Sequence, residues 1–141
     1  NAGMEINQAR KKLETGGVQS LAAFGIDIET LLRQVGMRIG EELSFSMKDI
    51  KGDVEYLNEI MDWWEYSGLG KLTYDIDPVF HIEVHLEQKI SEESLPLWAL
   101  DDGIIEGSIM SRYESRDGIE VVRILGDSSN SFHTRYEIVM N

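Results

Sequence analysis

The chain has 141 residues, no cysteine, and 26 Asp and Glu residues against 13 Lys and Arg residues, which gives a formal net charge of −13 at pH 7. A chain of this length can bury an ordinary hydrophobic core, so one domain without a disulfide or a structural metal is expected. The lack of cysteine excludes disulfides, thiolate nucleophiles and cysteine-ligated metal sites. The acidic balance argues against nucleic acid and anionic membrane surfaces as partners.

The longest apolar stretches fall far short of the ~20 residues that a membrane-spanning helix needs. No secretory signal is visible, so a cytoplasmic domain is the expectation. The opening Asn1-Ala2-Gly3 is typical of a cloning remnant. We therefore expect residues 1–26 to form a tag remnant and a helical arm, and residues 27–141 to form a single domain.

Three helices are predicted from apolar residues spaced three and four apart. The first covers 27–44, with Asp27 as its N-cap. The second covers 53–67 and ends before Gly68. The third begins near Glu93 or Leu95 and ends by about Glu114. The apolar side of the first helix consists of Ile28, Leu31, Leu32, Val35, Ile39 and Leu43.

Four strands are predicted where apolar and polar residues alternate. Residues 72–76 and 80–86 form a hairpin around Asp77-Pro78, and residues 119–124 and 132–138 flank a turn that starts at Gly126-Asp127. The order is helix, helix, two strands, helix, two strands. This order favours an α+β domain in which helices cover one face of an antiparallel sheet of about four strands.

The segment 81–87 places His81, Glu83, His85 and Glu87 on one face of a strand, because side chains alternate at period two. Two imidazoles and two carboxylates could bind a metal or transfer a proton, provided that another element closes over them. The simpler interpretation is a solvated face opposite a core face. The sequence favours the solvated face and leaves the metal site open.

Other candidate chemistry is weaker. Adjacent carboxylates such as Asp101-Asp102 do not face one another on a helix, so we assign them no catalysis. Gly103 and Gly107 lie inside a predicted helix, where their use is the close approach of another backbone rather than phosphate binding. Large soft side chains lie on or beside the inward helix faces, either as plain core or as the lining of an apolar cavity. They are Met37, Met61, Trp64, Trp98 and Met110.

The second half of the chain also carries a set of short motifs in a fixed order. A helix ends at Gly68-Leu69-Gly70 and leads into a strand, Pro96-Leu97-Trp98 precedes the Gly103 and Gly107 pair, and Glu120 precedes the Gly126-Asp127 turn. Together with Arg38-Ile39-Gly40 near the start, this order resembles the 4-vinyl reductase domain family, also described as hydrocarbon-binding. The resemblance covers roughly residues 36–140.

The resemblance implies a degenerate metal site. Metal-binding members of the family use three cysteines and a glutamate for zinc, whereas this chain has Trp98, Arg123 and Ser131 at the cysteine positions and keeps only Glu120. We infer that an ion pair between Glu120 and Arg123, with Trp98 filling the volume, replaces the metal. No zinc is predicted there.

The resemblance further implies a fold related to trafficking subunits of the TRAPP tethering complex, a homodimer, and an apolar cavity between helices and sheet. The hypothesis is a non-catalytic domain that senses an apolar or aromatic small molecule, with no cofactor. A fused or separate regulatory domain is a further candidate partner. The alternative is an assembly module without ligand, and a weaker one is an accessory enzyme of tetrapyrrole metabolism. The predicted ligand contacts are Met37, Trp64, Tyr74, Phe80, Trp98, Asp102 and Ile105.

Overall fold

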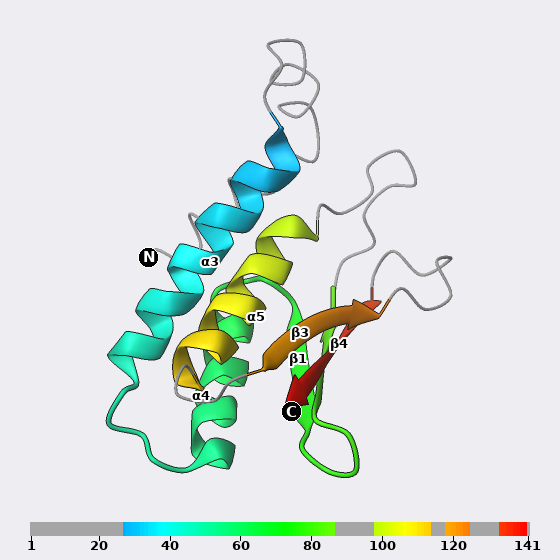
Figure 1. Ribbon diagram of the computed structural model, residues 1–141. Helices are drawn as coiled ribbons and strands as arrows, with labels where there is room; N and C mark the ends of the chain where they lie inside the picture. Colours follow the sequence, from blue (N-terminus) through cyan, green and yellow to red (C-terminus); the bar gives the residue numbers. More distant parts are fainter. Residues whose placement is uncertain (1–26, 87–97, 114–117, 125–132, 141) are drawn as a thin grey trace.

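The computed structural model describes residues 27–86, 98–113, 118–124 and 133–140. Their order is three helices and four strands, arranged as predicted: α3 (Ile28–Ser46), α4 (Asp53–Tyr66), β1 (Lys71–Asp75), β2 (His81–His85), α5 (Ala99–Arg112), β3 (Ile119–Ile124) and β4 (His133–Met140). The helices lie on one side of the sheet (Figure 1). The α+β prediction is confirmed. In the part of the chain that is described, no helix is long and apolar enough to cross a membrane.

Helix α3 begins at the predicted cap. Asp27 accepts hydrogen bonds from the backbone N–H of Thr30 at 3.2 Å and from its hydroxyl at 2.6 Å, which satisfies a first-turn donor that the helix cannot pair internally. The buried stripe differs from the predicted one, because it repeats every four residues. It consists of Ile28, Leu32, Gly36, Gly40 and Ser44. Leu31 and Val35, predicted to face inward, are each 45% exposed.

The stripe is displaced because α3 packs against α5 through glycines. A Cβ on Gly103 would lie 2.8 Å from the backbone N of Met37 and 3.0 Å from the Cα of Gly36, while one on Gly40 would lie 2.6 Å from the backbone N of Ser108. Gly107 meets the backbone of Met37 in the same way. The predicted role of Gly103 and Gly107 in close backbone approach is confirmed, and its partner is the Gly36 and Gly40 pair.

Helices α4 and α5 follow the predicted pattern. The chain leaves α4 through Gly68, whose φ of 76° lies in the left-handed region that favours glycine. Within the described residues α5 runs from Ala99 to Arg112, which agrees with the predicted end by about residue 114. The predicted start near residue 93 or 95 lies outside the described residues.

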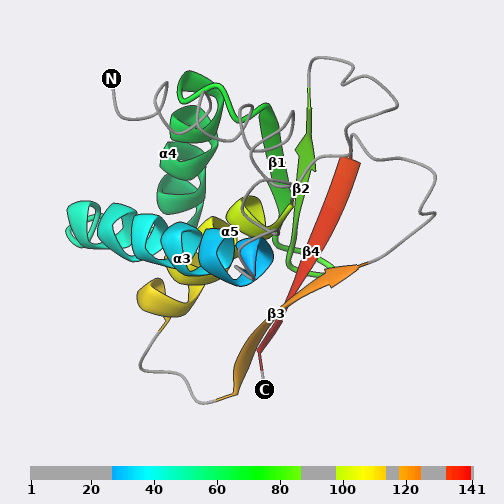
Figure 2. The same cartoon turned by 90° about the horizontal axis from the view of Figure 1, so that it is seen from above.

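The strands form one antiparallel sheet in the order β1-β2-β4-β3. The predicted β1–β2 hairpin is confirmed, with Leu72 opposite Val84 and Tyr74 opposite Ile82. Seen from above, α3, α4 and α5 stand on one side of the sheet, and none of them lies on the other (Figure 2). The sheet therefore has a helix-covered face and an outer face.

The core fills the space between the helices and the covered face. Leu72, Ile82 and Val84 are fully buried, and Tyr136 and Ile138 lie beside them on β4. Alternation places the intervening residues on the outer face. His81, Glu83 and His85 lie there on β2, as predicted for the side opposite the core. Glu87 lies outside the described residues.

Candidate functional site

A cleft of about 430 Å³ opens where α3, α5 and β3 meet. Three different elements therefore supply its walls. Its lining is mixed, with one large aromatic side chain, two arginines and two carboxylates. The lining residues are Glu29, Thr30, Arg33, Trp98, Ala99, Asp102 and Arg123.

Asp102 is the centre of the polar network in this cleft. One carboxylate oxygen, Oδ1, accepts a hydrogen bond from the hydroxyl of Tyr136 at 2.7 Å and lies 3.2 Å from Nε of Arg123. The other, Oδ2, lies 3.9 Å from Nη1 of Arg33. Asp102 on α5 thus joins α3, β3 and β4 through a side chain that is only 12% exposed.

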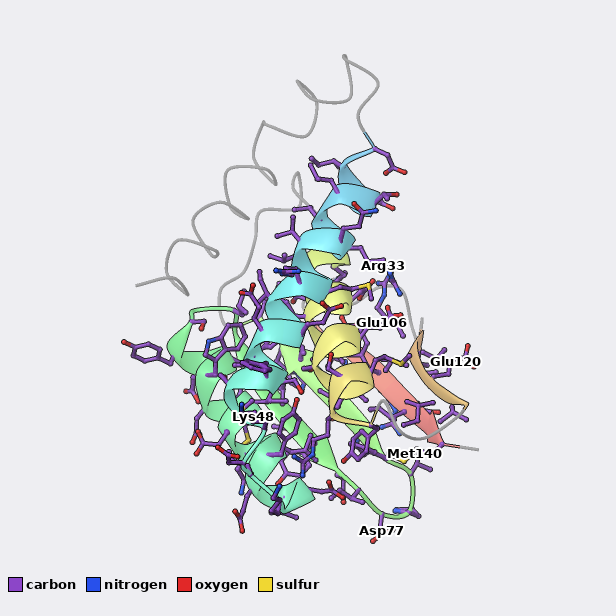
Figure 3. All side chains as sticks on the ribbon, turned by 60° about the vertical axis from the view of Figure 1, so that its left-hand side comes forward. Arg33, Lys48, Asp77, Glu106, Glu120 and Met140 are labelled. Carbon is purple, nitrogen blue, oxygen red and sulfur yellow. The ribbon has the colours of Figure 1, made fainter. Side chains whose placement is uncertain are left out.

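Arg33 has a second acidic partner. Its guanidinium contacts the carboxylate of Glu106, one helical turn after Asp102 on α5. Figure 3 shows Arg33 and Glu106 beside the α3–α5 contact. Arg33 is therefore held between two carboxylates that follow each other along α5.

The electrostatic state of Asp102 is set by competing effects. Burial raises its pKa above the ordinary value, and this effect is larger than the lowering by the Tyr136 hydroxyl and by the charges of Arg123 and Arg33. The pKa of Tyr136 is raised well above its ordinary value by burial and by nearby carboxylates. The phenol consequently stays protonated and can donate to Asp102.

Both arginines keep part of their surface open to solvent. The side chain of Arg33 is 47% exposed and that of Arg123 is 33% exposed. A guanidinium carries five N–H donors in a planar fork and pairs well with carboxylate or phosphate. The cleft can therefore offer cationic donors to an anionic group while Asp102 fixes their positions.

The structure divides the seven predicted ligand contacts among several places. Trp98 and Asp102 line the cleft together. Trp64 and Ile105 are fully buried in the hydrophobic core, and Phe80 packs against that core. Trp64, Ile105 and Phe80 therefore face inward as predicted, but they contact the protein's own side chains in the core.

The remaining two lie elsewhere. Tyr74 donates a hydrogen bond to Oδ1 of Asn58 at 2.7 Å, which ties β1 to α4 rather than to the cleft. Met37 is half-buried on α3, and its backbone forms the close contact with Gly103 and Gly107.

The positions predicted for a degenerate metal site come together only in part. Trp98 and Arg123 both line the cleft. The predicted ion pair between Glu120 and Arg123 is wrong, because residues three apart on a strand point to opposite faces. Arg123 turns to Asp102 on the helix side, whereas Glu120 is exposed and points away from the helices (Figure 3). Ser131 lies outside the described residues.

Three members of the network were not predicted from the sequence: Arg33, Glu106 and Tyr136. The signal for Glu106 was present, because it follows Asp102 by four residues and therefore shares its helix face. Arg33 lies one helical turn before Gly36 and therefore on the same face of α3. Because Gly36 packs against α5, Arg33 also lies beside α5, but this follows only from the tertiary contact. Tyr136 was predicted only as part of the strand 132–138.

No protein-family model matches the sequence, and no curated protein matches it. Among solved structures, the chain is similar to a vinyl-4-reductase family protein from Methanocaldococcus jannaschii. The two share 16% sequence identity with a TM-score of 0.53, and the match covers 88% of this chain and 81% of the other. This likeness establishes a shared fold, in agreement with the resemblance seen in the sequence motifs.

Proposed function

We propose that the domain is a non-catalytic binding module for a small molecule that combines a flat aromatic or apolar body with an anionic group. The observation that carries this proposal is the cleft, whose lining combines Trp98 with Arg33 and Arg123. The sequence predicted a plainly apolar or aromatic ligand. The charged lining changes that expectation, because an uncharged hydrocarbon would remove water from the exposed donors of Arg33 and Arg123 without replacing the lost hydrogen bonds.

Each part of the ligand would have a matching part of the cleft. An indole ring offers a large flat surface on which an aromatic ring can pack. The two arginines would pair with a carboxylate or phosphate, Arg33 from α3 and Arg123 from β3. The ion pairs with Asp102 and Glu106 hold these donors in place before the ligand arrives, which reduces the entropy lost on binding.

A ligand that contacts both arginines would also connect two layers of the fold. Arg33 belongs to α3 and Arg123 to the sheet, so occupancy would favour the arrangement in which both reach the same anionic group. Leu31 and Val35 are exposed on the same helix. If ligand binding moves α3, the exposed side chains of Leu31 and Val35 move with it. A partner or a second copy of the chain that contacts this surface would then respond to the ligand.

The test is a binding measurement with matched probes. Benzoate, naphthoate and indole acetate are titrated by calorimetry beside benzene, naphthalene and indole, their uncharged counterparts. We expect binding of at least one carboxylate and at least tenfold weaker binding of its uncharged counterpart. Arg123→Gln should weaken carboxylate binding at least about tenfold, since a charge-assisted hydrogen bond contributes ~1.5–3 kcal/mol.

Trp63→Phe is the control for Trp98→Phe. Trp63 lies on α4 and packs against the core outside the cleft. Only the Trp98 variant should lose affinity, with the fold of both checked by circular dichroism. Equal affinity of all variants, or binding of the uncharged probes alone, would reject the proposal. Because the ligand class is inferred, native mass spectrometry of freshly purified protein adds an independent search for a retained anionic aromatic compound.

An assembly module is the second candidate, and a specific observation favours it. Trp64 and Ile105, predicted to line an apolar cavity, are fully buried in the core, while Leu31, Val35 and Phe45 are exposed along α3. Sedimentation equilibrium of the wild type and of Val35→Glu tests this function. A wild-type dimer that Val35→Glu dissociates supports it, and a wild-type monomer at all accessible concentrations rejects it.

A further inference from the structure

A second group of chemically active side chains lies on the outer face of the sheet, away from the cleft. Glu83 and His85 come from β2 and His133 comes from β4. One ligand atom from each lies within 4.8 Å of the other two. A carboxylate and two imidazoles thus converge from two adjacent central strands.

Strand register produces this convergence. His85 and His133 are direct cross-strand partners, and Glu83 precedes His85 by two residues, so all three side chains leave the same face. The two imidazole rings are stacked, with centroids 4.3 Å apart and planes inclined by 20°. The sequence offered His81, Glu83, His85 and Glu87 from one strand. The structure brings Glu83 and His85 of that set together with His133 from the neighbouring strand.

The imidazoles are placed to accept a cation. Nε2 of His133 is buried and makes no hydrogen bond in the structure, and Oε1 of Glu83 lies 3.5 Å from it. A buried polar atom without a partner is unfavourable unless something else satisfies it. Burial, followed by repulsion from His133, lowers the pKa of His85, so protons compete less with a metal for its lone pair.

We propose that Glu83, His85 and His133 bind a divalent transition metal of the zinc type, with the fourth position open to water or a ligand. Two imidazoles and one carboxylate suit Zn²⁺, whereas Mg²⁺ and Ca²⁺ prefer oxygen ligands alone. Tetrahedral Zn²⁺ requires its ligand atoms roughly 3.4 Å apart. Binding requires the two imidazoles to turn out of their stacked arrangement so that both lone pairs point at one ion, and the three side chains, each partly exposed, are free to make that turn.

Arg135 sets the strength of this site. Its Nη1 lies 3.7 Å from Oε1 of Glu83, and its Nε lies 3.1 Å from Oε2 of Glu137. The guanidinium repels a dication and competes for the Glu83 carboxylate. Arg135→Gln should therefore strengthen metal binding, which is a gain that damage to the fold cannot imitate.

The experiment uses the full chain after removal of metal with a chelator. Zn²⁺ and Ni²⁺ are titrated by calorimetry, and Co²⁺ is followed by its visible absorption. We expect one metal per chain, absorption bands of tetrahedral Co²⁺, and a loss of more than ~100-fold in affinity for His133→Asn, beyond what removal of an outer-shell partner costs. His85→Asn and Glu83→Gln should lose affinity likewise.

His81→Asn is the matched control. His81 lies on the same strand and face, but its Nδ1 lies 2.9 Å from the carbonyl oxygen of Val79 and it is not part of the cluster. Its removal should leave affinity within about twofold. Equal affinity of the His133→Asn and His81→Asn variants, or weaker binding by Arg135→Gln, would overturn the proposal. If His133→Asn does not fold, Glu83→Gln and Arg135→Gln decide the outcome.

Discussion

The hydroxyl of Tyr136 on β4 donates a hydrogen bond to Oδ1 of Asp102 on α5 at a distance of 2.7 Å. Tyr136 is almost fully buried, and Asp102 is one of the residues that line the cleft. The bond joins the sheet to the helix layer at the point where Arg33 and Arg123 also reach the carboxylate. One buried polar contact therefore connects the hydrophobic core to the charged residues of the cleft.

Tyr136→Phe tests the contribution of this contact to stability. The variant keeps the ring in the core but leaves the Asp102 oxygen without its phenol donor. We expect the free energy of unfolding to fall by about 1–3 kcal/mol, because a buried hydrogen bond to a carboxylate is lost while only the Arg123 contact with the same oxygen remains. Urea denaturation measures it. The control is Tyr74→Phe, which removes a more exposed hydrogen bond to Asn58 and should cost less. Equal losses of unfolding free energy in the two variants would mean that the buried hydrogen bond to Asp102 stabilises the fold no more than the exposed one to Asn58.

The raised pKa of Asp102 gives a prediction for pH dependence. When the folded-state pKa of a carboxyl group exceeds its unfolded value, the folded protein holds the proton more tightly, so the group's contribution to stability falls as pH rises through the unfolded and then the folded pKa. Glu29 adds to the rise, while Tyr136, Arg123 and Arg33 oppose it. Wild-type Asp102 should therefore favour the fold most at acid pH.

The comparison is with Asp102→Asn, which cannot ionise. Unfolding free energies of both proteins are measured by urea denaturation from acid to neutral pH. The wild type should lose stability relative to Asp102→Asn as pH rises through the acid range, and the difference should level off above the folded pKa. A relative gain of the wild type over the same range would show that the arginines outweigh burial.

The sequence predicted the elements because their patterns are local. Leu72 and Val84 alternate with polar residues on a hairpin, and they occupy the core as expected. The resemblance also brought Trp98 and Arg123 to one region, and both line the cleft. The predicted ion pair between Glu120 and Arg123 was wrong. It was inferred by matching positions to a family motif, and such a match does not take into account that residues three apart on a strand point to opposite faces.

Other features depend on tertiary pairing that no local pattern contains. The displacement of the α3 stripe follows from Gly36 meeting Gly103, two residues far apart in the sequence. The contact between His85 and His133 follows from the register of β2 against β4. Periodicity identifies which face a residue occupies. It does not identify which distant residue lies opposite.

Gly103→Ala tests the glycine contact between α3 and α5. A Cβ at this position would lie 2.8 Å from the backbone N of Met37, and backbone atoms cannot turn aside as a flexible side chain can. The helices must separate, and we expect a loss of ~3 kcal/mol, at the upper end for overpacking. Thermal and urea unfolding measure the loss.

The control for this substitution is Gly52→Ala. A Cβ on Gly52 would lie 3.4 Å from the side chain of Glu55, which can move. Its φ of −81° suits any residue, so the variant should lose less than about 1 kcal/mol as an N-cap change. Similar losses for the two alanines would mean that the α3–α5 contact tolerates separation.

Arg112 connects the end of α5 to the segment that joins α3 and α4. Its Nη1 donates to the carbonyl oxygen of Ile50 at 2.6 Å, its Nη2 donates to that of Lys51 at 2.9 Å, and its guanidinium lies 4.4 Å from the centre of the Tyr56 ring. A lysine keeps the charge but cannot present two donors in one plane or stack on the ring in the same way.

Arg112→Lys should therefore lower the unfolding free energy by about 1–3 kcal/mol, because at least one carbonyl oxygen is left without its donor. The matched control is Arg38→Lys, since Arg38 makes only an exposed ion pair with Glu42 among the described contacts, at 3.1 Å. That variant should change stability by less than ~0.5 kcal/mol. A loss for Arg112→Lys no larger than the loss for Arg38→Lys would show that charge alone, rather than the planar pair of hydrogen bonds, anchors the end of α5.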